Sequence, residues 1–190
     1  MDTSHLTWKE IEHKEVYRSR IFSVRDTKSR SPGGEVREFT IIDAPDWVIV
    51  APLITTAAGE DAFVMVNQWR HGSGSLSMEF PGGVLEPGET PEEGALRELS
   101  EETAMKAGTI VHLGTMGPNP AIMSNHTHFF CAYDLMPLPS QKLDDDEYVD
   151  SVIINAGEVA RNMGKPPYIH ALTAAALALF ITQAPRSMAF

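Results

Sequence analysis

The sequence predicts an α/β fold in which helices cover both faces of a mixed β-sheet, preceded by a small antiparallel β unit. Three observations predict it: a series of strand-like segments, one strongly marked helix in their midst, and two helical segments that close the chain. With 190 residues the chain is long enough for one compact domain and an appendage. We expect the β unit over residues 1–44 and an α/β/α sandwich over residues 45–190.

The elements follow in chain order. Alternating and continuous apolar runs predict strands at residues 15–26, 36–43, 47–53, 62–68, 109–116, 126–133 and 150–154, and helices at residues 91–103, 156–164 and 168–182. The segment Ser31-Pro32-Gly33-Gly34 predicts a hairpin turn. The first strands are too few to be stable alone, and we expect one apolar face on them that must be covered, formed by Ile21, Phe22, Val24, Phe39, Ile41 and Ile42.

The helix at residues 91–103 has the best-defined beginning. Thr90 is a good N-cap residue, Pro91 suits the first helical position, and Glu93 stands three residues after the cap. Together they predict a capping box. We therefore expect this helix to begin at Pro91 and to run to about Thr103.

Three carboxylates share one face of this helix. Glu98, Glu101 and Glu102 are related by spacings of three and four residues. Like charges at these spacings destabilise a helix by about 0.2–0.5 kcal/mol per pair, so either Arg97 or a divalent cation should offset them. Oxygen ligands without His or Cys favour Mg²⁺ or Mn²⁺ over zinc. The alternative is an acidic helix face that is simply solvated.

The segment before the helix favours the metal-binding alternative. A strand end, a tight glycine-rich turn at residues 81–83 and a loop lead to the helix; Gly83 is followed after five residues by Glu89 and after seven more by Arg97. With the glutamates that follow, this segment resembles the signature of the Nudix hydrolase family, G-x5-E-x7-R-E-U-x-E-E-x-G-U, in which U is aliphatic. Ala104 stands where the signature has glycine. Either Ala104 adopts a left-handed conformation or the helix continues to Gly108.

The resemblance implies roles for the matching residues. Metal ligands would be Glu98 and Glu102, with Glu101 as a further ligand and the carbonyl of Gly82 as another, while Arg97 and Glu89 would orient them. The implied cofactor is Mg²⁺, with Mn²⁺ as a possible substitute. The implied reaction is the attack of water on a phosphorus of a nucleoside diphosphate linked to another group, with the metals as Lewis acids.

Further segments resemble the ADP-ribose pyrophosphatase branch of this family. They are Asn67-Gln68-Trp69-Arg70, Glu79-Phe80-Pro81-Gly82-Gly83 and the proline Pro120. Arg70 would contact a phosphate, since a guanidinium matches phosphate oxygens; the alternative is a surface salt bridge. Glu79 would touch substrate or a metal-bound water, or merely pair with a base, and Pro120 would lie at the substrate.

An acidic run at residues 144–147 matches a segment in which the branch carries a catalytic or metal-contacting glutamate. Glu147 is the matching position and Asp146 the second choice. A carboxylate from a separate loop can act as a general base outside the set of metal ligands, and the loop can close around substrate. The alternative is a solvated acidic loop.

The predicted function is hydrolysis of ADP-ribose to AMP and ribose 5-phosphate. GDP-mannose or another nucleotide sugar is the alternative substrate, and a noncatalytic nucleotide-sugar sensor is a further alternative. A sensor would usually have lost some of the acidic residues, and all three helix carboxylates are present. The branch exchanges its N-terminal unit across a dimer, which implies a homodimer here.

Composition limits the remaining possibilities. A net charge of −11 argues against nonspecific nucleic-acid binding. The most apolar run, residues 169–182, is shorter than the roughly 20 residues needed to span a bilayer, so we expect a buried helix and no membrane association. The single cysteine, Cys131, and a polar N-terminus without a signal peptide favour the cytoplasm. His126 and His128 alternate along a strand, where they can bind zinc or serve as polar residues of a sheet face.

Overall fold

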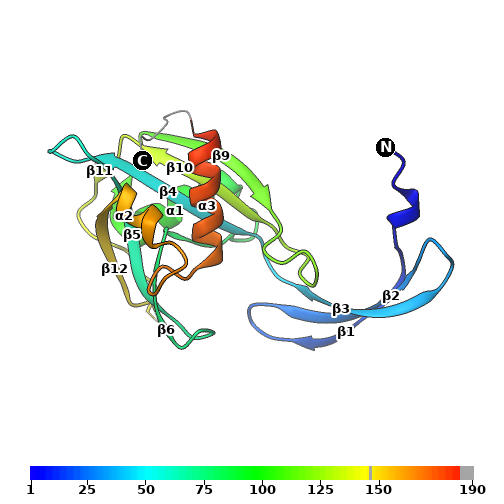
Figure 1. Ribbon diagram of the computed structural model, residues 1–190. Helices are drawn as coiled ribbons and strands as arrows, with labels where there is room; N and C mark the ends of the chain where they lie inside the picture. The colour runs from blue at the N-terminus through cyan, green and yellow to red at the C-terminus, as the bar shows by residue number, and fades with distance from the viewer. Residues whose placement is uncertain (146, 185–190) are drawn as a thin grey trace. The chain divides into compact units, whose positions relative to one another are not determined.

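The computed structural model describes residues 1–145 and 147–184, which form two compact units (Figure 1). The first unit contains residues 1–46 and 117–126. The second contains residues 47–116 and the described residues from 127 onward. Each unit has its own sheet.

The first unit is a three-stranded antiparallel sheet. A short 3₁₀ helix η1 (Ser4–Leu6) precedes the strands β1 (Lys9–Arg18), β2 (Ser23–Arg30) and β3 (Val36–Asp43). The predicted strand at residues 15–26 is wrong, because the chain reverses within it. The hydroxyl of Ser19 accepts the backbone N–H groups of Ile21 and Phe22 and so holds the turn between β1 and β2.

The apolar residues of this unit do not form one face. Val24 pairs with Ile42 and therefore shares a side of the sheet with it, while Phe39 pairs with Thr27 on the opposite side. Ile41 lies on the side of Phe39. The prediction of a single apolar face is therefore wrong, because consecutive residues of a strand point to opposite faces.

A segment from later in the chain packs on β3. The backbone N–H of Ile42 donates to the carbonyl of Ile122 at 2.7 Å, and the N–H of Ser124 donates to the carbonyl of Ile42 at 3.1 Å. This contact assigns residues 117–126 to the first unit. It involves residues far apart in sequence and has no local sequence signal.

The second unit is built on a mixed sheet in the order β12-β5-β4-β10-β9, with β6 beside β5 and β7 beside β4. The strands are β4 (Trp47–Thr55), β5 (Asp61–Arg70), β6 (Ser75–Glu79), β7 (Gly82–Val84), β9 (Thr109–Met116), β10 (Thr127–Tyr133) and β12 (Val149–Asn155). Only β4 and β10 pair in parallel. A two-residue pairing joins β8 (Met105–Lys106) to β11 (Met136–Pro137). The sequence prediction lacked β6, β7, β8 and β11, which are short and weakly patterned.

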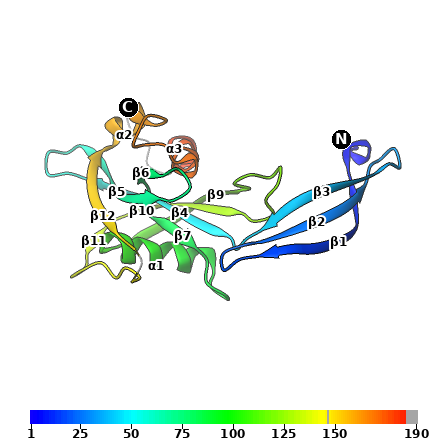
Figure 2. The same ribbon diagram turned by 90° about the horizontal axis from the view of Figure 1, so that it is seen from below.

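Helices cover both faces of this sheet, so the predicted three-layer sandwich is confirmed. Helix α1 (Pro91–Thr103) lies on one face, and α2 (Ala156–Asn162) and α3 (Ala171–Gln183) lie on the other (Figure 2). Val48 and Val50 of β4 pack towards α1, whereas Ile49 and Ala51 belong to the core under α2 and α3. A strand covered on both sides needs apolar residues at every position, which explains the continuous apolar run of β4. None of the described helices is long and apolar enough to cross a lipid bilayer.

Both ends of α1 are well defined. The hydroxyl of Thr90 accepts the N–H of Glu93 at 3.3 Å, and the carboxylate of Glu93 accepts the N–H of Thr90 at 2.9 Å, so the predicted capping box is confirmed. The helix ends at Thr103 because Ala104 is left-handed, with φ 52° and ψ 36°. Of the two sequence alternatives, the structure therefore contains the left-handed alanine.

Replacing Ala104 by glycine should raise the free energy of unfolding by about 1 kcal/mol, because glycine adopts this backbone without the Cβ clash. Urea denaturation measures the change. The control is Ala178→Gly on an exposed position of α3, where the same substitution should lower stability by up to about 1 kcal/mol. Stabilities that fall equally in both variants would contradict the assigned helix end.

Candidate active site

The carboxylates of α1 face the short strand β7. Glu98 is 8% exposed and Glu102 is 3% exposed. The backbone N–H of Gly82 donates to Oε2 of Glu102 at 2.9 Å. The structure thus brings together Gly82, Glu98 and Glu102, three of the residues predicted to surround a metal.

The two glycines of β7 leave room for these carboxylates. They were predicted to form a turn, but they lie in a strand that pairs with β4, Gly83 opposite Val48 and Gly82 opposite Ile49. A Cβ atom on Gly82 would lie 2.2 Å from the carbonyl oxygen of Val48, and one on Gly83 would lie 2.3 Å from Oε1 of Glu98. Glycine is required here by the close approach of β4 and α1 and not by an unusual backbone angle.

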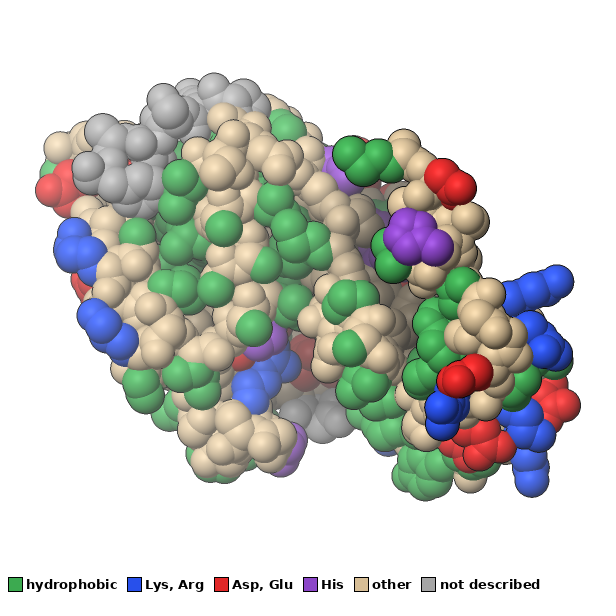
Figure 3. All heavy atoms as spheres, turned by 45° about the vertical axis from the view of Figure 1, so that its right-hand side comes forward, with side chains coloured by type: hydrophobic (Ala, Val, Ile, Leu, Met, Phe, Trp, Pro, Cys, Tyr) green, Lys and Arg blue, Asp and Glu red, His purple; other side chains and the backbone are tan. Residues whose placement is uncertain are grey.

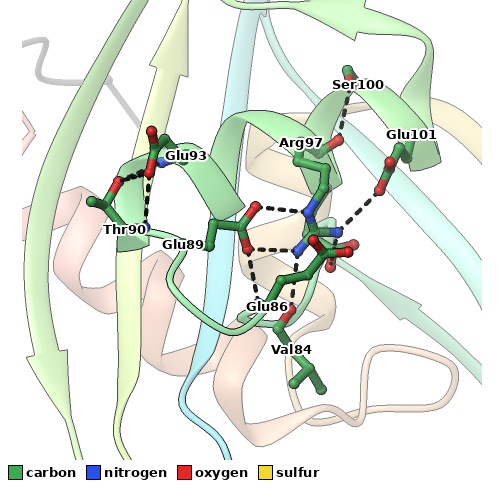
Figure 4. Close-up of polar contacts among 9 residues, drawn as sticks. Val84, Glu86, Glu89, Thr90, Glu93, Arg97, Ser100 and Glu101 are labelled. Atoms are coloured by element: carbon green, nitrogen blue, oxygen red, sulfur yellow. Dashed lines mark hydrogen bonds and ion pairs between the residues drawn. The ribbon is translucent and has the colours of Figure 1, made fainter.

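Arg97 is the centre of a polar network beside the helix (Figure 4). Its guanidinium donates to both oxygens of Glu89 at 2.8 and 3.0 Å, to Glu98 at 2.9 Å and to Glu101 at 3.1 Å. It also donates to the carbonyl of Val84 at 3.0 Å. The hydrogen bonds from Arg97 lower the pKa of Glu89. Arg97 therefore offsets the repulsion among the helix carboxylates, as one of the two sequence alternatives required.

Burial opposes the ionisation of the two carboxylates that face β7. It raises the pKa of Glu98 to about 7 and that of Glu102 to about 8, although Arg97 and the N–H of Gly82 partly stabilise the charged forms. A hard divalent cation would offset this cost, and the side chains offer only the oxygen donors that such a cation prefers. The residues therefore fit Mg²⁺ or Mn²⁺. Within the described chain no three His, Cys, Asp or Glu side chains converge as an assembled metal site, since Glu98 and Glu101 point to Arg97.

The loop that carries the acidic run is tied to the end of α1. The N–H of Leu138 donates to the carbonyl of Ala104 at 2.7 Å, and the N–H of Lys142 donates to the carbonyl of Glu101 at 3.0 Å. The side-chain amide of Gln141 donates to the carbonyls of Glu102 and Val149. The contacts at Glu101 and Glu102 satisfy carbonyls of the last turn of α1 that have no partner within the helix. The sequence analysis missed Gln141, for which a polar residue in a loop is no distinctive signal.

Glu147 projects from this loop and is exposed. Its carboxylate accepts the backbone N–H of Asp144 at 3.2 Å, and its negative charge acts to raise the pKa of both Glu98 and Glu102. Asp146, the second choice from the sequence, lies outside the described residues. Glu147 is not among the groups to which Arg97 donates, and its role at the helix carboxylates stays a prediction.

Arg70 and Glu79 form a second ion pair. Nε and Nη2 of Arg70, at the end of β5, donate to the two oxygens of Glu79 at 2.9 and 2.6 Å. The Glu79 side chain is fully buried, whereas that of Arg70 is 40% exposed. Because the Glu79 side chain is fully buried, the structure favours the alternative in which it pairs with a base over the one in which it touches substrate. Burial acts to lower the pKa of Arg70, but the hydrogen bonds and charge of Glu79, with the charges of Glu102 and Glu147, raise it overall.

Two further predicted residues lie elsewhere. Pro120 is an exposed residue of the first unit, in segment 117–126. Of the two histidines predicted to lie along a strand, His128 lies in β10 and His126 precedes it, because β10 begins at Thr127. His128 contacts the hydroxyl of Thr115 at 2.9 Å. It lines a hollow of about 600 Å³ with Thr90, Pro91, Glu92, Glu93, Leu96, His112 and Phe130.

Comparisons with known proteins agree with this architecture. Residues 46–173 match the family described as NUDIX domain. An "ADP-ribose pyrophosphatase" of Bacillus subtilis strain 168 is 33% identical over 150 residues, which are 75% of this chain and 78% of the relative. A "Methanol dehydrogenase activator" of Bacillus methanolicus is 28% identical over 79% of this chain and 80% of the relative. The crystal structure of an "ADP compounds hydrolase" superposes with a TM-score of 0.80 at 23% identity, covering 94% of this chain and 96% of that chain, and so has the same fold.

The two glycines of β7 should respond differently to alanine. Gly82→Ala meets the backbone of β4 and should lower the free energy of unfolding by about 1–3 kcal/mol. Gly83→Ala meets only the end of the Glu98 side chain, which can move, so this variant should stay folded while losing affinity for divalent cations. Urea denaturation and calorimetric titration with magnesium measure the two effects.

Gly72→Ala is the matched control, because its Cβ would enter open space. It should leave both quantities unchanged. Normal magnesium affinity in a folded Gly83→Ala protein would show that Glu98 does not depend on the space that Gly83 leaves.

Proposed function

The chain belongs to the NUDIX family of hydrolases, and we propose that it cleaves the pyrophosphate bond of ADP-ribose to give AMP and ribose 5-phosphate. The observation that carries this proposal is the buried pair Glu98 and Glu102 against the glycines of β7. Support for the substrate comes from the ADP-ribose pyrophosphatase of Bacillus subtilis, with which the chain shares 33% identity. Arg70, on which the charge of Glu102 acts, adds a group that can bind the phosphates of such a substrate.

We propose Mg²⁺ as the cofactor, held by Glu98 and Glu102 with Glu101 and the carbonyl of Gly82. When bound, the cation would polarise phosphate oxygens and make water a better nucleophile. Arg97 and Glu89 hold the helix carboxylates in place through the network described above. Arg70 binds a phosphate of the substrate, and Glu147 accepts a proton from the attacking water.

The proposed function is tested by incubating the purified protein with magnesium and a panel of nucleotide sugars and dinucleotides. Mass spectrometry identifies the products. ADP-ribose should disappear fastest, with AMP and ribose 5-phosphate formed in equal amounts. Faster turnover of GDP-mannose would overturn the substrate assignment, and no turnover of any compound would favour a noncatalytic nucleotide-sugar sensor.

Two conservative variants should separate the proposed roles of the carboxylates. Glu102→Gln keeps the size of the side chain but removes a buried ligand charge, so both turnover and magnesium affinity should fall strongly. Glu147→Gln should lower kcat by about 10²–10⁴-fold, the range for loss of a general base, with little change in magnesium affinity. Steady-state kinetics and calorimetry give the two readouts.

Asp145→Asn is the control, since Asp145 is an exposed carboxylate of the same loop. It should retain kcat. Near-normal turnover of Glu102→Gln at saturating magnesium would disprove its role, and a fall in magnesium affinity in Glu147→Gln would make that residue a ligand.

We propose that the protein is a homodimer in which the first unit contacts a second copy. This unit exposes large apolar side chains, among them Trp8 just before β1 at 43% and Phe39 of β3 at 44%, whose rings pack edge to face at 5.2 Å. Figure 3 shows hydrophobic side chains on this unit beside acidic and basic ones. A three-stranded sheet has little capacity to bury such residues itself, so a second copy would stabilise it.

Phe39→Glu should convert the dimer to a monomer, because the charge would be buried on association. The KM for ADP-ribose should rise as well. Light scattering measures the mass. Val36→Glu is the matched control: Val36 is 46% exposed but lies on the opposite face of the sheet, so this variant should remain dimeric. A monomeric wild-type protein would contradict the proposal. These single changes keep β3 in place, whereas deletion of residues 1–43 would also remove the partner of segment 117–126.

A further inference from the structure

The last turn of α1 is electrostatically unfavourable. The C-terminal end of a helix carries a partial negative charge and leaves backbone carbonyls without partners, so donors or cations stabilise it. In α1 this turn contains Glu101 and Glu102, and it has no basic residue. Two carboxylates of the proposed cation site therefore lie where the helix is least stable, and donors from outside the helix have to hold them.

The segment that follows β11 supplies such donors. The backbone N–H of Lys142 donates to the carbonyl of Glu101 at 3.0 Å. Next to it, the side-chain amide of Gln141 donates to the carbonyl of Glu102. These donors take the place of the intrahelical partners that the end of a helix lacks. Of these two contacts, that of Gln141 comes from a side chain and can be removed without changing the backbone.

Both hydrogens of the Gln141 amide are used. Nε2 donates to the carbonyl of Glu102 and, at 3.3 Å, to the carbonyl of Val149. An amide nitrogen has two N–H donors and so matches two carbonyls, whereas a carboxylate of the same shape has only acceptors. Val149 is buried and begins β12, where it pairs with Gln68 of β5. Gln141 therefore joins the end of α1 directly to the sheet.

Glu102 is held at two points. Its Oε2 atom accepts the N–H of Gly82 at 2.9 Å, and its main-chain carbonyl accepts the amide of Gln141. The residue is 3% exposed and stands one position before the last residue of the helix. Fraying of a single turn would move this carboxylate away from β7, and the contact with Gln141 opposes that fraying.

We infer that Gln141 is a positioning residue for the proposed cation site: by fixing the last turn of α1 to the start of β12, its amide holds the carboxylate of Glu102 against β7. This inference deepens the proposed function and rests on it. Loss of the amide removes one donor from each of the two carbonyls, so the last turn opens more often. The expected consequence is weaker binding of the cation.

Two substitutions separate the donors from the volume of the side chain. Gln141→Met keeps the length but has no donor, and Gln141→Glu directs acceptors at two carbonyls. Calorimetric titration should show magnesium binding weakened by about tenfold for methionine, the scale of one or two lost hydrogen bonds, and by more for glutamate. Magnesium affinity equal to that of the wild type in Gln141→Met would overturn the inference.

The dependence of turnover on magnesium distinguishes positioning from a general structural role. In Gln141→Met the magnesium concentration for half-maximal turnover of ADP-ribose should rise by the same factor as the dissociation constant. At saturating magnesium kcat should return to that of the wild type, because the bound cation favours the ordered turn. A kcat that stays low at every magnesium concentration would refute the inference.

Lys142→Ala is the matched control. Lys142 is exposed and donates to Glu101 through its backbone N–H, which the substitution retains. This variant should bind magnesium as the wild type does. An equal loss of affinity in Lys142→Ala and Gln141→Met would show that any change in this segment disturbs the site, and would contradict a specific role of the amide.

Hydrogen exchange of the metal-free protein gives a readout that does not depend on turnover. Peptides covering residues 98–104 should exchange faster in Gln141→Met than in the wild type and Lys142→Ala, while peptides of α3 should exchange equally in all three. If the wild type hydrolyses no nucleotide sugar, the proposed function fails, but this difference still supports the role of Gln141 in fixing the turn. Unchanged exchange of residues 98–104, or an equal rise in α3, would refute that role even in an active enzyme.

Discussion

The close packing of helix α1 on strand β7 is the constraint on which the site depends. It places the carboxylates of Glu98 and Glu102 against a backbone that has no room for side chains, so Gly82 and Gly83 are required there. Both carboxylates are thereby buried, and burial makes their ionisation unfavourable and raises their pKa. The hard cation proposed for this site would relieve this cost.

The remaining polar contacts distribute charge around this pair. Arg97 joins Glu89, Glu98 and Glu101 on the outer side of the helix, and Arg70 is held by the buried Glu79. The two arginines differ in purpose. Arg97 donates its hydrogen bonds to groups of the protein and thereby stiffens the helix. Arg70 has further N–H groups that can donate to a ligand. A set of carboxylates together with a guanidinium held by Glu79 suits the proposed recognition of a pyrophosphate.

Local signals predicted the most from the sequence. The capping box, the bounds of α1 and the strands at residues 36–43 and 109–116 all agree with the structure, because each depends on residues close together in the chain. The predicted elements were wrong where the local sequence did not indicate a turn, or where glycines indicated a turn that the structure does not contain. Ser19 reverses the chain inside an apparently continuous strand, and the glycines of β7, which suggested a turn, form a strand because β4 lies beside them.

The sequence by itself determined the spacing of Glu98, Glu101 and Glu102 on one helical face, and the glycine, glutamate and arginine that accompany them, since helical geometry converts spacing directly into position. Tertiary structure alone decided which groups these side chains meet. The anchoring of the acidic loop on the end of α1 and the meeting of Arg70, Glu79 and His170 join segments that are distant in the chain. Such contacts form only when sheet order and helix packing bring the segments together, and no local pattern encodes that order.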